Sequence, residues 1–369
     1  MTSRLLTNLE NRIAREENDV MRAQLRAERA AHLARRGEME DAKLELLSIR
    51  QGNSVHGNPR TSIWTHIAEG VVELTEGREL AAIDRFMRAR AVAIAVDTPR
   101  EISVVSAWLA YIAYTQNDLH LTVTRINEVT SIGIDADRSA LGRSRLLVGQ
   151  AFHFAGEYEV ARPWYAAARD LAVESGDDGL TSALLFNIAS LHVYNYRQYI
   201  LRGRSTTVPL DFLALTTESV RNYDKMIGID SLKSYAGTMV ASLHLFHGRY
   251  REALEMFGEF VAISEGEGLG RMKSLYTAEM AYCAVLLGDE SLAAKLASEA
   301  ELAITEGVHV EDRAATRSRL AQIFATLGDT NSSSQQVAIA EVEWVKHEGF
   351  QREVLKGLTR LDTSVAGSR

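Results

Sequence analysis

The sequence contains very little cysteine and proline. Its 369 residues include one Cys and 4 Pro. A single cysteine excludes an internal disulfide and any zinc site built from several cysteines. Cys283 lies in the apolar run Met-Ala-Tyr-Cys-Ala-Val-Leu-Leu, which predicts a buried, unreactive thiol. The scarcity of proline and of alternating Val, Ile and Thr favours helix over strand.

Long apolar runs and an excess of basic residues are also missing. No window approaches the roughly 18 uncharged apolar residues of a membrane span, and the first residues lack the apolar core of a signal peptide. We therefore expect no membrane partner and a cytoplasmic location. The net charge of -8 argues against nucleic acid as a partner, because phosphate binding needs a concentrated basic face. Acidic residues such as Glu28 lie among the N-terminal arginines, which indicates a solvated helix face with local ion pairs.

Catalytic and cofactor motifs are missing as well. The glycine-rich stretch 266–270 has no Lys directly after its last Gly and no preceding strand, so it does not match a phosphate-binding loop. No Gly-x-Ser-x-Gly element occurs, and the histidines are scattered without zinc-ligand spacing. The sequence predicts no catalytic residue, no cofactor and no metal. An enzyme with its site in a groove therefore ranks third among the functions that we consider.

A helix–turn–helix repeat organises most of the chain. Short turns with Gly or Asn, which tolerate a left-handed backbone, recur at positions 37, 77, 117, 156, 248, 288 and 328. Neighbouring turns lie 39 or 40 residues apart, except that 92 residues separate 156 from 248, which we interpret as two repeats with about 12 extra residues. Small residues such as Gly70 and Gly149 precede each turn by seven positions, Ala161 follows one by five, and large residues such as Phe86 and Tyr165 follow by nine. This spacing predicts closely packed helix pairs.

The repeat pattern is strongest in Gly149-Gln-Ala-Phe152…Gly156-Glu-Tyr158…Ala161…Tyr165…Ala168. It resembles the tetratricopeptide repeat (TPR) family, and the resemblance covers roughly residues 17–348. The usual repeat has about 34 residues, whereas this one has 40, which corresponds to about one added turn in each helix. The longer form resembles the TPR-type sensor and interaction regions of bacterial regulators, such as the maltose activator and the peptide-binding regulators of Gram-positive bacteria.

The resemblance implies an all-α fold, a right-handed superhelical α-solenoid of about eight TPR-like helix–turn–helix repeats. We expect one solenoid domain over residues 1–361, with an N-terminal capping helix at 1–16, repeats at 17–348, a C-terminal capping helix at 349–361 and a disordered tail at 362–369. Thr98-Pro99-Arg100-Glu101 predicts a helix start with a capping box. The extra residues of the enlarged fifth repeat fall between Val193 and Leu210, either as an insertion on the binding face or as a longer helix.

The candidate binding site is the concave face, which the first helices of the repeats line in TPR proteins. Projecting that geometry onto the sequence gives an aromatic and hydrogen-bonding surface of the type found at binding hot spots. The candidate groove residues are Trp64, Trp108, Tyr111, Tyr114, Arg143, Gln150, His153, Asn187, Tyr194, Tyr235, Ser242, Glu279, Tyr282, Arg319 and Gln322. The alternative is that half or more of them pack between neighbouring first helices.

These features predict a non-catalytic interaction module or scaffold that binds a protein segment, a peptide or an identical subunit in its concave groove. The alternative is a regulatory protein that senses a small ligand or a signalling peptide. The two hypotheses differ in the site that they require. A sensor needs a closed pocket with a few polar groups, whereas a scaffold offers an open groove to macromolecules.

Overall fold

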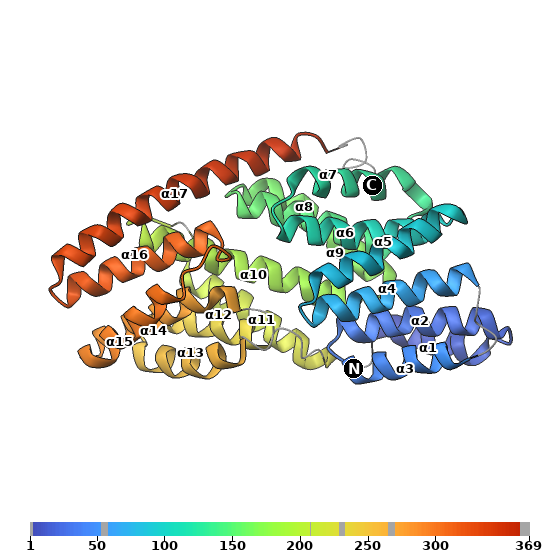
Figure 1. Ribbon diagram of the computed structural model, residues 1–369, viewed down its shortest axis with the longest axis horizontal. Helices are drawn as coiled ribbons and strands as arrows, with labels where there is room; N and C mark the ends of the chain where they lie inside the picture. Colours follow the sequence, from blue (N-terminus) through green and yellow to red (C-terminus); the bar gives the residue numbers. More distant parts are fainter. Residues whose placement is uncertain (1–2, 53–57, 207, 229–232, 265–269, 362–369) are drawn as a thin grey trace. The chain divides into compact units, whose positions relative to one another are not determined.

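The computed structural model of the protein describes residues 3–52, 58–206, 208–228, 233–264 and 270–361. These residues form helices joined by short turns, and they contain no strand (Figure 1). The predicted all-α class is therefore confirmed. The tail that the sequence analysis predicts to be disordered, residues 362–369, lies outside the described residues.

The helices that follow α1 (Arg4–Arg15) form consecutive pairs of a first and a second helix. The pairs are α2 (Asp19–Arg35) with α3 (Met39–Gln51), α4 (Pro59–Thr75) with α5 (Glu79–Ala95), α6 (Pro99–Thr115) with α7 (Leu119–Ile132), α8 (Arg138–Phe154) with α9 (Tyr158–Ser175), α10 (Asp178–Leu201) with α11 (Leu210–Ile227), α12 (Lys233–Phe246) with α13 (Tyr250–Ser264), α14 (Lys273–Leu286) with α15 (Glu290–Leu302), and α16 (Val310–Thr326) with α17 (Thr330–Leu358). Two short 3-10 helices, η1 (Gly133–Asp135) and η2 (Gly270–Met272), precede α8 and α14. This order is that of a helical repeat protein.

The turn residues within the pairs adopt the backbone conformation that the sequence predicts. Positive φ angles between 74° and 87° occur at Gly37, Gly77, Gly156, Gly248, Gly288 and Gly328, and Asn117 has a φ of 61°. Around Gly77, the amide of Arg78 donates to the carbonyl of Glu73 at 2.8 Å, and the Gly77 amide donates to Leu74 at 3.1 Å. This double hydrogen bond ends a helix at a left-handed residue, which explains why Gly or Asn is required there.

Small residues allow the two helices of a pair to approach closely. A Cβ atom added to Gly70 would lie 2.8 Å from the ring of Phe86, and one added to Gly149 would lie 2.8 Å from the ring of Tyr165. Ala161, one turn before Tyr165 in α9, is fully buried. The predicted packing of small against large residues is confirmed at these positions.

The capping box predicted at the start of α6 is wrong. The helix begins at Pro99 as expected, but the Thr98 hydroxyl donates to the carbonyl of Ala93 at 3.3 Å and makes no capping hydrogen bond. The Glu101 carboxylate accepts a hydrogen bond from the Trp64 indole at 3.2 Å. The Glu101 carboxylate, which would accept from the Thr98 amide in a capping box, instead bonds to Trp64 of α4.

Two further sequence features are resolved by the helix boundaries. Helix α10 continues to Leu201, so the extra residues of the enlarged repeat begin as a longer helix. Helix α17 continues to Leu358 without a break at residue 349, so the last repeat and the predicted C-terminal cap share one helix.

The single cysteine is buried as the sequence predicts. Cys283 is fully buried in α14, and burial raises the pKa of its thiol to about 12.

The chain divides into two compact units. Unit 1 contains Met1–Leu184, Tyr223–Ser231 and Val354–Arg369, and unit 2 contains Leu185–Asn222 and Leu232–Glu353. The core of unit 1 includes Phe86 and Trp64, and the core of unit 2 includes Phe257 and Trp344. The single domain expected over residues 1–361 stays a prediction.

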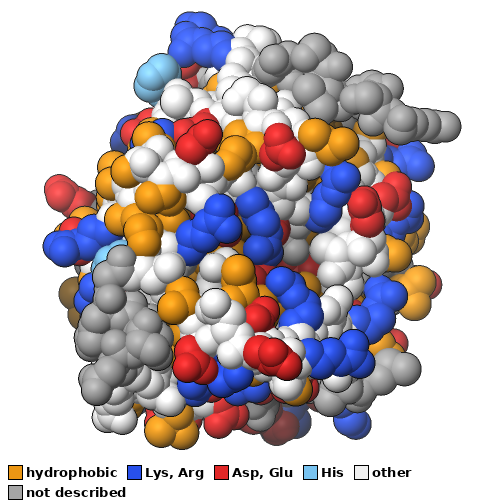
Figure 2. Space-filling model, turned by 90° about the vertical axis from the view of Figure 1, so that its right-hand side faces the viewer, with side chains coloured by type: hydrophobic (Ala, Val, Ile, Leu, Met, Phe, Trp, Pro, Cys, Tyr) orange, Lys and Arg blue, Asp and Glu red, His pale blue; other side chains and the backbone are white. Residues whose placement is uncertain are grey.

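The surface drawn in Figure 2 carries basic and acidic side chains interspersed with each other, with hydrophobic side chains scattered between them. Within the described part of the chain, none of the helices has the length and hydropathy required to cross a bilayer.

Candidate binding site

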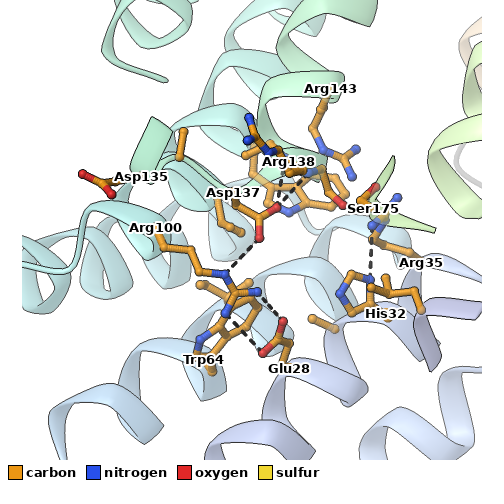
Figure 3. Close-up of a pocket in the computed structure, with 18 residues that line it drawn as sticks. Glu28, His32, Arg35, Trp64, Arg100, Asp135, Asp137, Arg138, Arg143 and Ser175 are labelled. Carbon is orange, nitrogen blue, oxygen red and sulfur yellow. Dashed lines mark hydrogen bonds and ion pairs between the residues drawn. The ribbon is translucent and has the colours of Figure 1, made fainter. Parts of the chain in front are cut away.

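A cavity of about 280 Å³ lies within unit 1 (Figure 3). Its walls come mainly from the first helices α2, α4, α6 and α8, with η1 and the end of α9 closing one side. Apolar and charged side chains both line it, so the cavity combines an apolar wall with groups able to bind an ion. Its volume lies just below the roughly 300–1,000 Å³ typical of small-molecule pockets.

Two tryptophans form the apolar wall. Trp64 is 2% exposed, and Trp108 stacks on Phe86 with ring centroids 5.9 Å apart and an interplanar angle of 8°. Ile67 of α4 and Val104 of α6 belong to the same wall. Because Trp64 and Phe86 belong to the core of unit 1, the wall is held by the same packing that stabilises the fold.

Arg100 reaches between two carboxylates at one side of the cavity, as Figure 3 shows. Its guanidinium donates to Glu28 of α2 and, at 3.1 Å, to Asp137. Asp137 is the N-cap of α8 and accepts from the amides of Ser139 and Ala140. Burial alone would lower the pKa of Arg100, but Glu28 and then Asp137 outweigh it and raise that pKa. Glu28 is buried, so its assignment to a solvated helix face is wrong.

Arg35 and His32 lie beside each other on another side of the cavity (Figure 3). Arg35 binds the buried Asp177 carboxylate through two hydrogen bonds of 2.9 and 3.1 Å. Burial would raise the pKa of Asp177, but Arg35 and His32 lower it well below its usual range. Burial, and then Arg35, lower the pKa of His32 to about 4, so its ring is neutral near pH 7. Its Nδ1 atom faces an Arg35 nitrogen at 3.3 Å and must accept, which places the ring proton on Nε2.

Arg143 of α8 is the cation that faces the tryptophan wall. Its guanidinium carbon lies 3.8 Å from the centre of the Trp108 ring, a cation–π contact. Among the described residues, no carboxylate lies within ion-pair distance of Arg143, unlike Arg35 and Arg100. Burial, and then the neighbouring Arg35, lower the pKa of Arg143 to about 9. The guanidinium nevertheless stays charged at neutral pH.

This arrangement is suited to binding. The lining combines aromatic rings, apolar side chains and hydrogen-bond donors of fixed orientation. Within the described part of the chain, no group of three His, Cys, Asp or Glu side chains is placed to hold a metal ion. The cavity therefore offers recognition of an ionic group next to an apolar one.

The cavity brings together three of the candidate residues in unit 1, Trp64, Trp108 and Arg143. Tyr111 packs edge-on against Trp108 with centroids 6.3 Å apart and is 36% exposed, which makes it the most accessible of the aromatic candidates. His153 is buried, and its Nδ1 atom lies 3.2 Å from the Tyr165 hydroxyl. His153 of α8 therefore packs against α9, as in the alternative that candidate residues pack between helices. Tyr114 and Gln150 are half-buried.

Several candidates in unit 2 belong to one internal network. Glu279 is fully buried between two guanidinium groups, with Arg319 Nε at 2.8 Å and Arg197 Nε at 3.3 Å. Arg197 also donates to the Ser242 hydroxyl at 2.7 Å. Arg319 donates to Gln322 at 2.6 Å and lies 4.1 Å from the centre of the Tyr282 ring. The sequence prediction found most of this network but omitted Arg197.

The remaining candidates in unit 2 make separate contacts. The Tyr194 hydroxyl lies 3.1 Å from His347 Nε2, and Tyr235 packs on Phe186 with ring centroids 5.0 Å apart. Asn187 is half-buried in α10. The candidate residues are thus distributed over two units, and their common role in a groove stays a prediction.

The sequence analysis found Arg143 but missed the ion pairs that line the unit 1 cavity. The ion pairs Arg100–Glu28 and Arg35–Asp177 join residues 72 and 142 positions apart, so no local pattern reveals them. One signal was available at Asp137, because Asp before an apolar helix is a typical N-cap and fixes where that side chain lies.

Comparisons with known proteins identify the fold only. No protein-family model and no curated protein matches the chain. Among solved structures, it is similar to a Rap protein complexed with competence and sporulation factor, with a TM-score of 0.54 and 10% identity over 96% of this chain and 98% of that chain. The apo form of RapI gives a TM-score of 0.45 and 13% identity, covering 96% of this chain and 92% of that one. The first similarity supports the helical-repeat fold.

Proposed function

We propose that the chain is a non-catalytic interaction module that binds a peptide or protein segment on the first helices of its repeats. The observation that carries the proposal is the unit 1 cavity, because Trp108 and Arg143 both line it and contact each other there. Aromatic and arginine side chains in partly desolvated pockets dominate binding energies in protein interfaces.

Two further points support the proposal. The first helices line the cavity, and these are the helices that face the partner in TPR proteins, which the 40-residue sequence pattern resembles. We propose that the pattern is a lengthened TPR unit of the kind found in sensor and interaction regions of bacterial regulators. The similar Rap structure was solved with competence and sporulation factor, which makes a comparable ligand a reasonable starting point for this chain.

The alternative function is a regulatory sensor for a small ligand. The size of the cavity favours it, because about 280 Å³ accommodates a compact molecule or one or two residues of a peptide rather than a long segment. A sensor should show a large increase in melting temperature with a small compound, whereas an interaction module should respond to peptides or proteins.

Tyr111→Ala tests the proposed function. Peptides selected from a random library on the full chain are titrated against the wild-type and variant proteins. Because Tyr111 is 36% exposed beside Trp108, we expect the variant to melt near the wild type and to bind at least about fivefold more weakly, the loss of roughly 1 kcal/mol or more expected of a hot-spot residue.

Tyr199→Ala provides the matched control, because Tyr199 is 39% exposed and lies in unit 2. It should bind the selected peptides as the wild type does. A strongly destabilised Tyr111→Ala protein would assign Tyr111 to the core. If no peptide is selected and a small compound raises the melting temperature, the sensor function replaces the interaction module.

A further inference from the structure

Four arginines line the unit 1 cavity, and among the described residues Arg143 is the one of the four that forms no ion pair. Arg35 pairs with Asp177, Arg100 pairs with both Glu28 and Asp137, and Arg138 pairs with Glu174. Within the described residues, Arg143 has no carboxylate within ion-pair distance. A half-buried guanidinium without an acidic partner is unfavourable for the folded protein, because part of its hydration is lost without an ion pair in return.

The guanidinium of Arg143 is nevertheless held in a defined position. One face is covered by the Trp108 ring at 3.8 Å, a contact of about 0.5–2 kcal/mol. Trp108 in turn stacks on the buried Phe86. The N–H groups lie in the plane of the guanidinium, so stacking leaves its edge able to donate two parallel hydrogen bonds to one anionic group.

The neighbouring side chains indicate which anion fits. Glu28, Asp135 and Asp137 also line the cavity, so a doubly charged phosphate would meet more repulsion than a singly charged carboxylate. The Trp64, Ile67 and Val104 wall lies in the same cavity and excludes water from a non-polar group. A planar, singly charged anion attached to an apolar group satisfies both surfaces.

We propose that the unit 1 cavity binds one carboxylate attached to an apolar group, with Arg143 as its counter-ion and the tryptophan wall against the apolar part. The carboxylate can come from a small organic acid, from the C-terminus of a peptide or from an acidic side chain. If the carboxylate comes from a peptide C-terminus or an acidic side chain, the proposal rests on the proposed function. If it comes from a small organic acid, it does not.

A matched pair of small probes tests the carboxylate directly. N-acetyl-L-leucine and N-acetyl-L-leucinamide have the same apolar group and differ in the charge at one end. Each is titrated into the full chain labelled with ¹⁵N-tryptophan, whose 4 indole signals are assigned by substitution. We expect the acid to shift the Trp108 signal with at least about tenfold higher affinity than the amide, because a hydrogen bond to a charged group contributes about 1.5–3 kcal/mol.

Arg143→Met separates the proposed counter-ion from general effects of charge. It should lose the tenfold preference for the acid and should melt close to the wild type, because the lost contact with Trp108 is offset by removing a half-buried cation that has no ion-pair partner. The matched control is Arg162→Met, since Arg162 is an exposed arginine of the same unit that pairs with Glu159 outside the cavity. This control should keep the preference of the wild type. Equal affinities for acid and amide, or an unchanged preference in Arg143→Met, would overturn the proposal. Tighter binding of inorganic phosphate than of the acid would also overturn it.

Peptide pools distinguish this proposal from the proposed function. Three random hexapeptide pools are applied to the full chain. The first contains no Asp or Glu and has free C-termini, the second has the same composition with amidated C-termini, and the third is amidated but includes Glu. Preferential retention of the first or third pool identifies a terminal or side-chain carboxylate. Equal retention of all pools, with no binding of N-acetyl-L-leucine, leaves the interaction module intact and rejects the carboxylate site. Binding of N-acetyl-L-leucine without retention of any pool supports the site and rejects the peptide function.

Discussion

Glu279 carries a carboxylate that is fully buried between the guanidinium groups of Arg197 and Arg319. The two arginine side chains are only 6% and 3% exposed, so neither can turn to water if the carboxylate is lost. A buried ion pair of this kind adds little net stability compared with apolar packing, yet removing one partner leaves charge without compensation. The network is therefore much more sensitive to changes in charge than to changes in shape.

Glu279→Gln should lower the free energy of unfolding by about 3–5 kcal/mol, because two buried cations then face a neutral amide of nearly the same shape. Urea unfolding followed by circular dichroism measures the change. Glu299→Gln is the control, since Glu299 forms an exposed pair with Lys295 at 3.9 Å and should cost less than about 1 kcal/mol. Equal effects of the two substitutions would show that the contacts of Glu279 with Arg197 and Arg319 do not stabilise the fold.

Arg143 differs from Arg197 and Arg319 although all three contact aromatic rings. The unit 2 arginines share a buried carboxylate, which completes a structural network. Arg143 faces a cavity and has no such partner within the described residues. The same residue type in the same kind of helix thus serves packing in one unit and is available for a ligand in the other, and the difference depends on a single acidic side chain.

At the scale of helices, glycine acts in two ways that the environment separates. Gly149 of α8 is buried against α9, where a Cβ atom would lie 2.8 Å from the Tyr165 ring and 3.3 Å from Trp164 Cβ. Gly258 of α13 is exposed, and a Cβ atom there would meet only the flexible end of Met280 at 3.9 Å. Close packing fixes the first glycine, whereas the second only reduces helix propensity.

Gly149→Ala should therefore destabilise the protein by up to about 2 kcal/mol, because overpacking costs about 1–3 kcal/mol and the gain in helix propensity offsets roughly 1 kcal/mol. Gly258→Ala should stabilise it by about 0.5–1 kcal/mol, because the gain in propensity is unopposed. Thermal unfolding of the two variants beside the wild type gives both signs. Stabilisation by Gly149→Ala would show that α8 and α9 are packed less closely than the structure indicates.

The helix pairs could be predicted because their determinants are local. The turn at Gly77 and the contact between Gly70 and Phe86 follow from spacings of a few residues, which the period of the α-helix converts into shared faces. The same projection found Trp108 and Arg143 of the cavity. It failed at Thr98 because the intended capping partner bonds to a different helix, a competition that no local pattern records.

The ion pairs that line the cavity could not be predicted, because their partners are far apart in the sequence. Arg35 and Asp177 are 142 residues apart in the sequence, so their pairing depends on the path of the chain through the intervening repeats. The acidic residues among the N-terminal arginines cannot be told apart in the sequence, but Glu28 is buried and Asp19 is exposed. Helical periodicity identifies which residues share a face, whereas the partner of each charge is set by the fold of the whole unit.

Across the whole molecule, unit 1 is assembled from distant parts of the chain. Residues 354–361, after the last repeat, belong to it together with the first four helix pairs. The end of α17 lies beside α7 in Figure 1, where the Asn127 amide donates to the carbonyl of Arg360 at 3.1 Å. Val354, Leu358 and Leu361 are all buried. The C-terminal segment therefore covers apolar surface that the N-terminal repeats would otherwise expose.

Leu358→Ala tests this closure. Because Leu358 is 6% exposed, its truncation should destabilise unit 1 by about 2–5 kcal/mol, the usual cost of removing a buried leucine side chain. Hydrogen exchange should become faster at the α7 amides, whereas α13 and α15, in unit 2, should keep their protection. Leu302→Ala is the control, because Leu302 is 80% exposed and its truncation should change stability by less than about 0.5 kcal/mol. Unchanged exchange in α7, or equal acceleration in both units, would show that the C-terminal segment does not close unit 1 specifically.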